Sequence, residues 1–190
     1  MDTLTTGKVY LDGQEISGLN RKQLTEYRRH DVGFVFQFYN LIGNLTALEN
    51  VELANQICKN PLDAAQVLRD VGLGDRVRNF PSQLSGGEQQ RVAIARALGM
   101  DTGILLADEP TGNLDTANSE NIAALLCRLA HEEGYCVIIV THDMDLAAKA
   151  DEILELCEFA ILPQRDYRAY KTLSDGKVKK GSTPFKLIKA

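Results

Sequence analysis

Two adjacent acids, Asp108 and Glu109, follow a run of four apolar residues at positions 104–107. Such a run predicts a buried strand, and side chains just past the end of a parallel strand enter the crevice where α/β sheets bind ligands. An aspartate there can help to hold Mg²⁺, and a glutamate can orient and deprotonate an attacking water. The pair alone is a weak signal, because many strands end in two acids.

The run LSGGEQQ at residues 84–90 is more specific. Gly86 and Gly87 let the backbone come close to a ligand, the Ser85 hydroxyl can donate a hydrogen bond, and the free amides at a helix start favour an anion. Together these properties suit a triphosphate. A serine-capped helix after a flexible turn would explain Ser85 and Gly86, but not the whole run as far as Arg91.

With the two acids following in the expected order, this run resembles the signature motif of ABC transporter ATPases, and residues 104–110 (ILLADEP) resemble their Walker B motif. Gln37 at the end of VGFVFQ resembles the Q-loop glutamine, residues 112–115 (GNLD) the D-loop, and His142 in VIIVTHD the switch histidine.

Each of these three also has a plain structural alternative. Gln37 could be a polar strand end, Asp115 a helix cap, and His142 a polar group satisfied beside Asp143. Individually these alternatives would be preferred, but five motifs in the family's order between residues 37 and 142 favour the resemblance.

The resemblance implies ATP and Mg²⁺ as cofactors and a homodimer or heterodimer of such subunits, with each ATP held between two chains. Asp108 and Gln37 would serve Mg²⁺, Glu109 the attacking water, and His142 the γ-phosphate. The nucleotide contacts implied are Gln37, Ser85, Gly86, Gly87, Glu88 and Asp115, of which Ser85 and Gly87 would touch the partner's γ-phosphate.

The stretches FVFQFYNLIGNLTALENV and DEPTGNLD are especially similar to the exporter and lipoprotein-release branch, which includes macrolide-exporter ATPases. This similarity implies transmembrane permease subunits as partners, and a cytoplasmic protein that sits at the inner face of the cell membrane only through them. The transported substrate is not encoded in these motifs.

The composition fits that expectation. The chain has 190 residues, 44% hydrophobic and 25% charged, and its longest apolar runs are far too short to cross a bilayer. The net charge of −5 argues against a surface for nucleic acid. The four cysteines lack a paired CxxC spacing, so reduced thiols are the simplest interpretation.

The elements that must position these motifs follow from hydrophobic periodicity and turn residues. Strands are predicted at residues 9–11, 14–16, 32–36, 104–107 and 137–140, helices at 21–30, 45–56, 63–71, 87–99 and 116–133, and a second hairpin at 169–180. Helices that alternate with buried strands indicate an α/β fold with a mostly parallel sheet and peripheral antiparallel hairpins. The resemblance makes this a P-loop NTPase-like domain over residues 1–190, with a catalytic core at about 1–37 and 100–190 and an inserted α-helical subdomain at about 38–99.

A Walker A sequence, GxxxxGK[ST], is absent from the 190 residues, and the two Gly-Lys pairs are each followed by valine. Residues 1–7 resemble the segment that follows the Walker A helix, so we expect the sequence to begin inside the domain, without that strand and helix. Apolar sheet and backbone hydrogen-bonding groups would then lack a neighbour. We therefore expect the chain alone to be poorly stable and to hydrolyse ATP weakly or not at all.

Two hypotheses remain open at this point. The sequence is that of a transporter ATPase without its N-terminal part, or it is a non-catalytic product that donates its signature motif in trans to a complete partner. An in-frame Walker A segment in the DNA upstream would support the first, and a stop codon the second. A non-transport ABC ATPase is disfavoured, because the sequence shows neither long heptads nor a duplicated cassette. The segment 155–170 has no functional interpretation.

Overall fold

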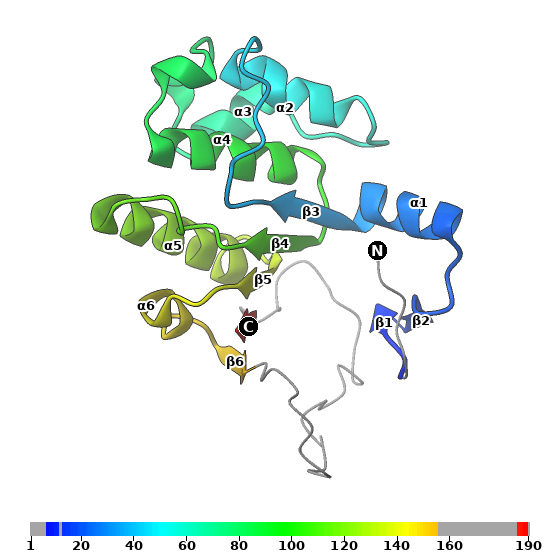
Figure 1. Ribbon diagram of the computed structural model, residues 1–190. Coiled ribbons are helices and arrows are strands. Elements are labelled where there is room, and N and C mark those ends of the chain that lie inside the picture. The colour runs from blue at the N-terminus through cyan, green and yellow to red at the C-terminus, as the bar shows by residue number, and fades with distance from the viewer. Residues whose placement is uncertain (1–6, 12, 156–185, 190) are drawn as a thin grey trace.

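A five-stranded parallel sheet forms the centre of the molecule (Figure 1). The computed structural model describes residues 7–11, 13–155 and 186–189. The strand order is β3-β4-β5-β7-β6, and each neighbouring pair is parallel. The strands are β3 (Val32–Val35), β4 (Ile104–Asp108), β5 (Cys136–Val140), β6 (Glu152–Glu155) and β7 (Lys186–Lys189). This arrangement confirms the predicted α/β class with its parallel sheet.

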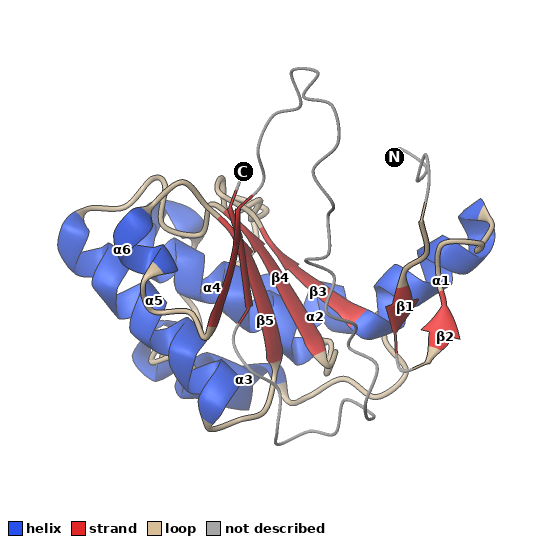
Figure 2. Ribbon diagram, turned by 90° about the horizontal axis from the view of Figure 1, so that it is seen from below, coloured by secondary structure: helices blue, strands red, loops and turns tan. Residues whose placement is uncertain are grey.

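Helices α4 (Gly86–Gly99) and α5 (Thr116–His131) lie along one side of the sheet, whereas α1 (Arg21–Asp31) and the hairpin lie on the other side of it (Figure 2). The hairpin pairs β1 (Tyr10–Leu11) with β2 (Gln14–Glu15) in antiparallel fashion, as predicted. Helices α2 (Ala47–Asn55) and α3 (Ala64–Asp70) pack on α4. Two 3-10 turns, η1 (Gly74–Arg76) and η2 (Pro81–Gln83), lead into α4, and α6 (Met144–Ala147) joins β5 to β6.

Local capping sets the starts of three of these helices. Reciprocal capping boxes join Asn20 to Gln23 before α1, Thr46 to Glu49 before α2, and Ser85 to Glu88 before α4. In each box the cap side chain accepts from the backbone of the third helical residue, whose own side chain accepts from the cap's backbone amide. Ser85 is therefore the cap that the sequence predicts, and the helix begins one residue earlier than expected, at Gly86.

The two faces of the sheet differ in burial. Leu105, Ala107, Val137 and Ile139 alternate with half-buried neighbours and belong to the core beneath the helices. On the opposite face, Phe34, Leu106 and Ile138 form one register row and are only half-buried. We call these three residues the open face.

The second hairpin predicted at residues 169–180 and nearly all of the segment 155–170 lie outside the described residues. The sequence predicts no element at residues 186–189, where β7 lies between β5 and β6. Within the described part of the chain, no helix is long and apolar enough to span a bilayer.

Candidate functional site

The candidate site lies at the carboxyl ends of three adjacent parallel strands. Gln37 follows β3, Asp108 closes β4, and His142 follows β5 by two residues. The register pairs Val35 with Ala107 and Asp108 with Val140, so the three strands end at the same edge of the sheet. Asp108 is exposed there.

Glu109 is held by three hydrogen bonds from the segment that follows β5. Its Oε1 accepts from the His142 backbone amide at 2.9 Å and lies 2.7 Å from His142 Nδ1. Its Oε2 accepts from the Thr141 hydroxyl at 2.9 Å. The Glu109 side chain is 20% exposed and that of His142 78% exposed, so the carboxylate is fixed while the imidazole faces outward. The structure thus brings together the two residues that the resemblance assigns to catalysis.

The backbone of Glu109 is in the left-handed region, with φ of 45°. Its amide donates to the Val140 carbonyl at 2.8 Å, which extends the pairing of β4 with β5 by one residue. A non-glycine residue in this region costs on the order of 1 kcal/mol or more, and such strain persists only where surrounding bonds impose it. The bonds to Thr141 and His142 supply that restraint.

Gln37 contacts the segment that the sequence assigns to the D-loop. The Asn113 side-chain amide donates to the Gln37 carbonyl at 2.9 Å. A Cβ on Gly112 would lie 2.8 Å from Gln37 Nε2, so a larger residue there would displace the end of the Gln37 side chain. Gln37 therefore contacts the segment around Gly112, although the two residues lie 75 positions apart in the chain.

Ser85 and Glu88 are occupied in the capping box of α4. The Ser85 hydroxyl oxygen accepts from the Glu88 amide at 3.3 Å, and Glu88 Oε2 accepts from the Ser85 amide at 2.7 Å. The bond from the Ser85 amide holds the pKa of Glu88 below its ordinary value, with a smaller contribution from Arg76 Nε 3.4 Å away. Because the serine oxygen acts as an acceptor, its own hydrogen is left to donate to a ligand.

Gly86 and Gly87 are also explained by contacts within the chain. A Cβ on Gly86 would meet the Tyr39 hydroxyl at 2.9 Å, and one on Gly87 would meet Asn118 Oδ1 at 2.5 Å. From the sequence, the two glycines are expected only to let the backbone approach a ligand. In the structure they also leave room for the side chains of Tyr39 and Asn118. Asp115 caps α5, with its two carboxylate oxygens bonded to the backbone and side-chain amides of Asn118 at 2.8 and 3.0 Å.

The sequence alone does not predict several residues that shape the site. Thr141, Asn113, Asn118 and Arg96 act through contacts that depend on how strands and helices pack. Only Thr141 carries a usable signal, since it stands between a buried strand and His142. It is 1% exposed, and its hydroxyl also accepts from the Asp143 amide at 3.0 Å.

No three His, Cys, Asp or Glu side chains gather into a metal-binding group among the described residues. Magnesium does not need such a group, because it is commonly held by one or two protein ligands together with substrate phosphates and water. An exposed Asp108 carboxylate and the Gln37 side chain at the same sheet edge fit that limited role.

A pair of acids at the carboxyl end of a parallel strand, with a glutamine and a histidine following the two neighbouring strands, is typical of α/β proteins that act on nucleotide phosphates. The sequence pattern of the ABC transporter family matches residues 1–112. The chain belongs to this family, whose members are ATPases.

The names of two relatives indicate which branch of the family the chain resembles. The chain is 45% identical over 177 residues to the macrolide export ATP-binding/permease protein MacB of Aggregatibacter actinomycetemcomitans, covering 90% of this chain and 27% of that protein. It is 44% identical over 161 residues to the lipoprotein-releasing system ATP-binding protein LolD of Shewanella frigidimarina, covering 82% of this chain and 67% of that one. The chain thus spans only about a quarter of the MacB relatives.

A solved structure shares the fold. A dimeric ATP-binding cassette in a post-hydrolysis state, bound to ADP and Pi, superposes with a TM-score of 0.66 and 43% sequence identity. The match covers 78% of this chain and 68% of that one. The ABC ATPase fold expected from the motifs is thereby confirmed.

Proposed function

We propose that this chain is the ATP-binding and hydrolysing part of an ABC transporter that couples ATP turnover to movements of permease partners. The observation that carries the proposal is the placement of Glu109 at the end of β4, bonded to Thr141 and His142 after β5. A carboxylate fixed in this way can orient a water molecule and accept its proton.

The other site residues take the roles that the family resemblance implies. Asp108 and Gln37 would hold Mg²⁺, which would offset charge on the phosphates. His142, whose ring is exposed, would donate to the γ-phosphate, and the amides and hydroxyl at the start of α4 would bind phosphate held by a second subunit. Gly86, Gly87, Glu88 and Asp115 shape and orient that helix start through the contacts described above.

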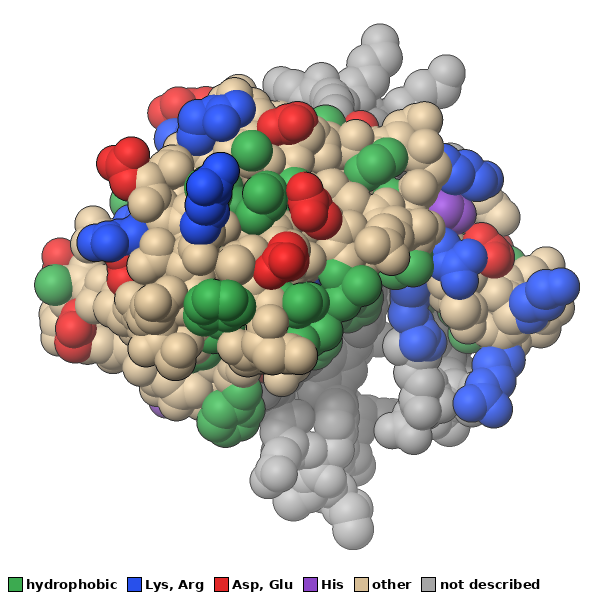
Figure 3. Space-filling model, turned by 90° about the horizontal axis from the view of Figure 1, so that it is seen from above, with side chains coloured by type: hydrophobic (Ala, Val, Ile, Leu, Met, Phe, Trp, Pro, Cys, Tyr) green, Lys and Arg blue, Asp and Glu red, His purple; other side chains and the backbone are tan. Residues whose placement is uncertain are grey.

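The proposed partners are permease domains and a second ATPase subunit. The name of the MacB relative joins an ATP-binding to a permease function, and the solved cassette is dimeric. Hydrophobic side chains interrupt the polar surface of the face that carries the packed helices (Figure 3). Phe38, Leu53, Ile57 and Phe80 are between 41 and 74% exposed and would be covered by a partner. Contact with partners at the inner membrane face would place this chain in the cytoplasm.

The division of the chain into a catalytic core and a helical subdomain is also a proposal. Residues of about 38–99 form the helical subdomain, and about 1–37 and 100–190 form the core. The packing of α2 and α3 on α4, rather than on the strands, supports this division.

Hydrolysis in the assembled transporter tests the function. Replacing Glu109 by Gln should lower ATP turnover by at least 10²-fold while ATP still binds, because the general base is lost and the phosphate contacts are kept. Glu132→Gln, an exposed glutamate at the end of α5, serves as the control and should leave turnover unchanged. Equal turnover in the Glu109→Gln and parent proteins would refute the assignment.

A further inference from the structure

Arg96 reaches from α4 to the backbone that follows Gln37. Its Nη1 donates to the Asn40 carbonyl at 2.5 Å and its Nη2 to the Tyr39 carbonyl at 3.0 Å. The guanidinium is half-buried, and burial lowers the pKa of Arg96 from its ordinary value. One planar group thus binds two consecutive carbonyls that lie more than fifty residues away in the chain.

The backbone that Arg96 binds is in an unusual conformation. Tyr39 and Asn40 both lie in the left-handed region, with φ of 50° and 51°. Neither is glycine, so the conformation is unfavourable for both and requires bonds from outside the segment. The two bonds from Arg96 are of the required kind, because the guanidinium has several donors in a fixed planar arrangement.

A second contact joins the same two elements near the other end of α4. A Cβ on Gly86 would lie 2.9 Å from the Tyr39 hydroxyl oxygen, so the phenol packs against the start of α4. Leu114 of the D-loop lies 3.4 Å from the same point. Residues 37–40 are therefore bonded to α4 at Arg96 and packed against it near Gly86, two positions almost three turns apart.

We propose that Arg96 is a positioning residue that fastens residues 37–40, which carry Gln37, to the helix that carries Ser85 and Gly87. With this tie in place, the residue expected to serve Mg²⁺ on one nucleotide and the residues expected to bind a second nucleotide move together. The mechanical tie itself is independent of the proposed function, whereas its role in ATP turnover rests on it.

Arg91 provides a matched control on the same helix. Its Nη1 donates to the Val71 carbonyl at 2.9 Å, beyond the end of α3, so it makes the same kind of bond to a different target. A general loss of stability would follow from changing either arginine to lysine. Only Arg96→Lys should loosen residues 37–40.

The experiment uses hydrogen exchange and one added fluorophore on the full chain. The sequence contains no tryptophan, and Phe38 is 74% exposed, so Phe38→Trp places a single reporter inside the segment. In the Arg96→Lys protein, amide exchange at residues 38–41 should rise at least tenfold relative to α5, and the anisotropy of the Trp emission should fall because the segment that carries it moves more freely. Arg91→Lys should change neither quantity.

Unchanged exchange in Arg96→Lys, or equal changes in both arginine variants, would overturn the proposal. Asn40→Val is a second route, because a β-branched residue resists the left-handed conformation while Arg96 stays intact. It should loosen the same amides, and it decides the question if Arg96→Lys does not fold. Addition of Mg·ATP to the Phe38→Trp protein tests the proposed function separately. If the Trp emission does not change, ATP binding is not supported, but the hydrogen-exchange result still decides whether Arg96 positions residues 37–40.

Discussion

Gln90 lies within the signature run with its side chain completely buried. Among the residues that the structure describes, neither its Oε1 nor its Nε2 has a hydrogen-bond partner. A buried amide without partners costs free energy that an apolar side chain of similar size does not. We expect Gln90→Met to raise the free energy of unfolding by about 1–2 kcal/mol, measured by urea denaturation.

The neighbouring Gln89 is the control for that experiment. Its Nε2 donates to the Leu84 carbonyl at 3.1 Å, so Gln89→Met removes a real bond and should cost about 1 kcal/mol. A destabilising Gln90→Met would mean that the amide is satisfied in solution.

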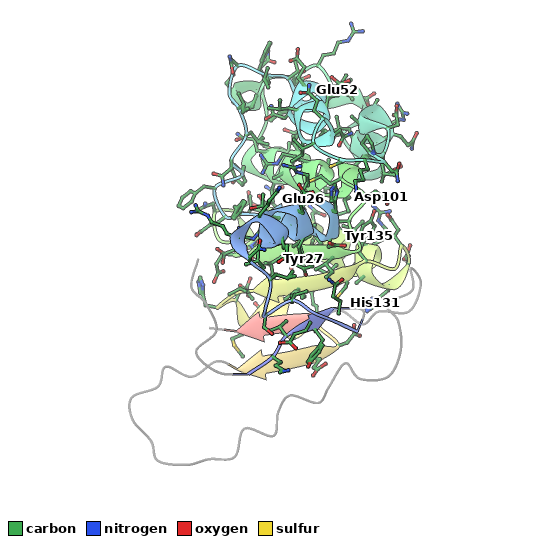
Figure 4. All side chains as sticks on the ribbon, turned by 90° about the vertical axis from the view of Figure 1, so that its right-hand side faces the viewer. Glu26, Tyr27, Glu52, Asp101, His131 and Tyr135 are labelled. Carbon is green, nitrogen blue, oxygen red and sulfur yellow. The ribbon has the colours of Figure 1, made fainter. Side chains whose placement is uncertain are left out.

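Tyr135 gives a prediction in alkaline solution. This residue leads into β5 (Figure 4), and burial raises its pKa to about 12. The unfolded chain ionises Tyr near pH 10, so stability is complete below pH 10 and falls between about pH 10 and 12. Tyr135→Phe should remove up to about 2 kcal/mol of that fall, measured as unfolding free energy against pH. An unchanged alkaline slope would contradict the burial of the phenol.

At the scale of elements, β3 and α4 approach so closely that a side chain at Gly33 would be crowded. A Cβ on Gly33 would lie 3.0 Å from the Ala97 carbonyl oxygen and 3.0 Å from Thr102 Oγ1. Gly33→Ala should therefore destabilise the protein by about 1–3 kcal/mol in thermal or chemical unfolding. Gly103→Ala, with nothing within 4 Å of its Cβ, should change stability by less than about 0.5 kcal/mol. Similar losses in both variants would show that crowding at Gly33 is not the cause, since restriction of the unfolded chain by alanine favours folding at both positions.

The elements themselves were within reach of the sequence where local chemistry fixes them. Ser85 with Glu88 predicts the start of α4, and the apolar run at 104–107 predicts β4, because caps and strand cores depend on nearby residues. Tyr39 and Asn40 could not be predicted, since no glycine marks their left-handed backbone.

The contacts between motifs were out of reach for a different reason. Asn113 meets Gln37, and Asn118 meets Gly87, only once the strand order and helix packing are settled. The strand β7 was out of reach for the same reason, because a four-residue segment with two lysines around Leu187 and Ile188 becomes a strand only through pairing with β5 and β6.

At the scale of the whole molecule, two adjacent leucines of β4 lie on opposite faces of the sheet. Leu105 is 1% exposed beneath the helices, whereas Leu106 belongs to the half-buried open face. Leu105→Ala should cost about 2–5 kcal/mol, because it leaves a cavity in the core. Leu106→Ala should cost about 1 kcal/mol or less, since its site is partly hydrated already. Urea denaturation of both variants measures the difference, and equal costs would show that both sides are equally covered.

The open face also bears on what happens to this polypeptide during production in a cell. A row of apolar side chains that is only half covered is a surface that chaperones bind and that joins one copy to another as concentration rises. Leu106 lies at its centre. We therefore expect a polar residue such as threonine at that position to raise the yield of dispersed protein, with no change in the residues that handle ATP.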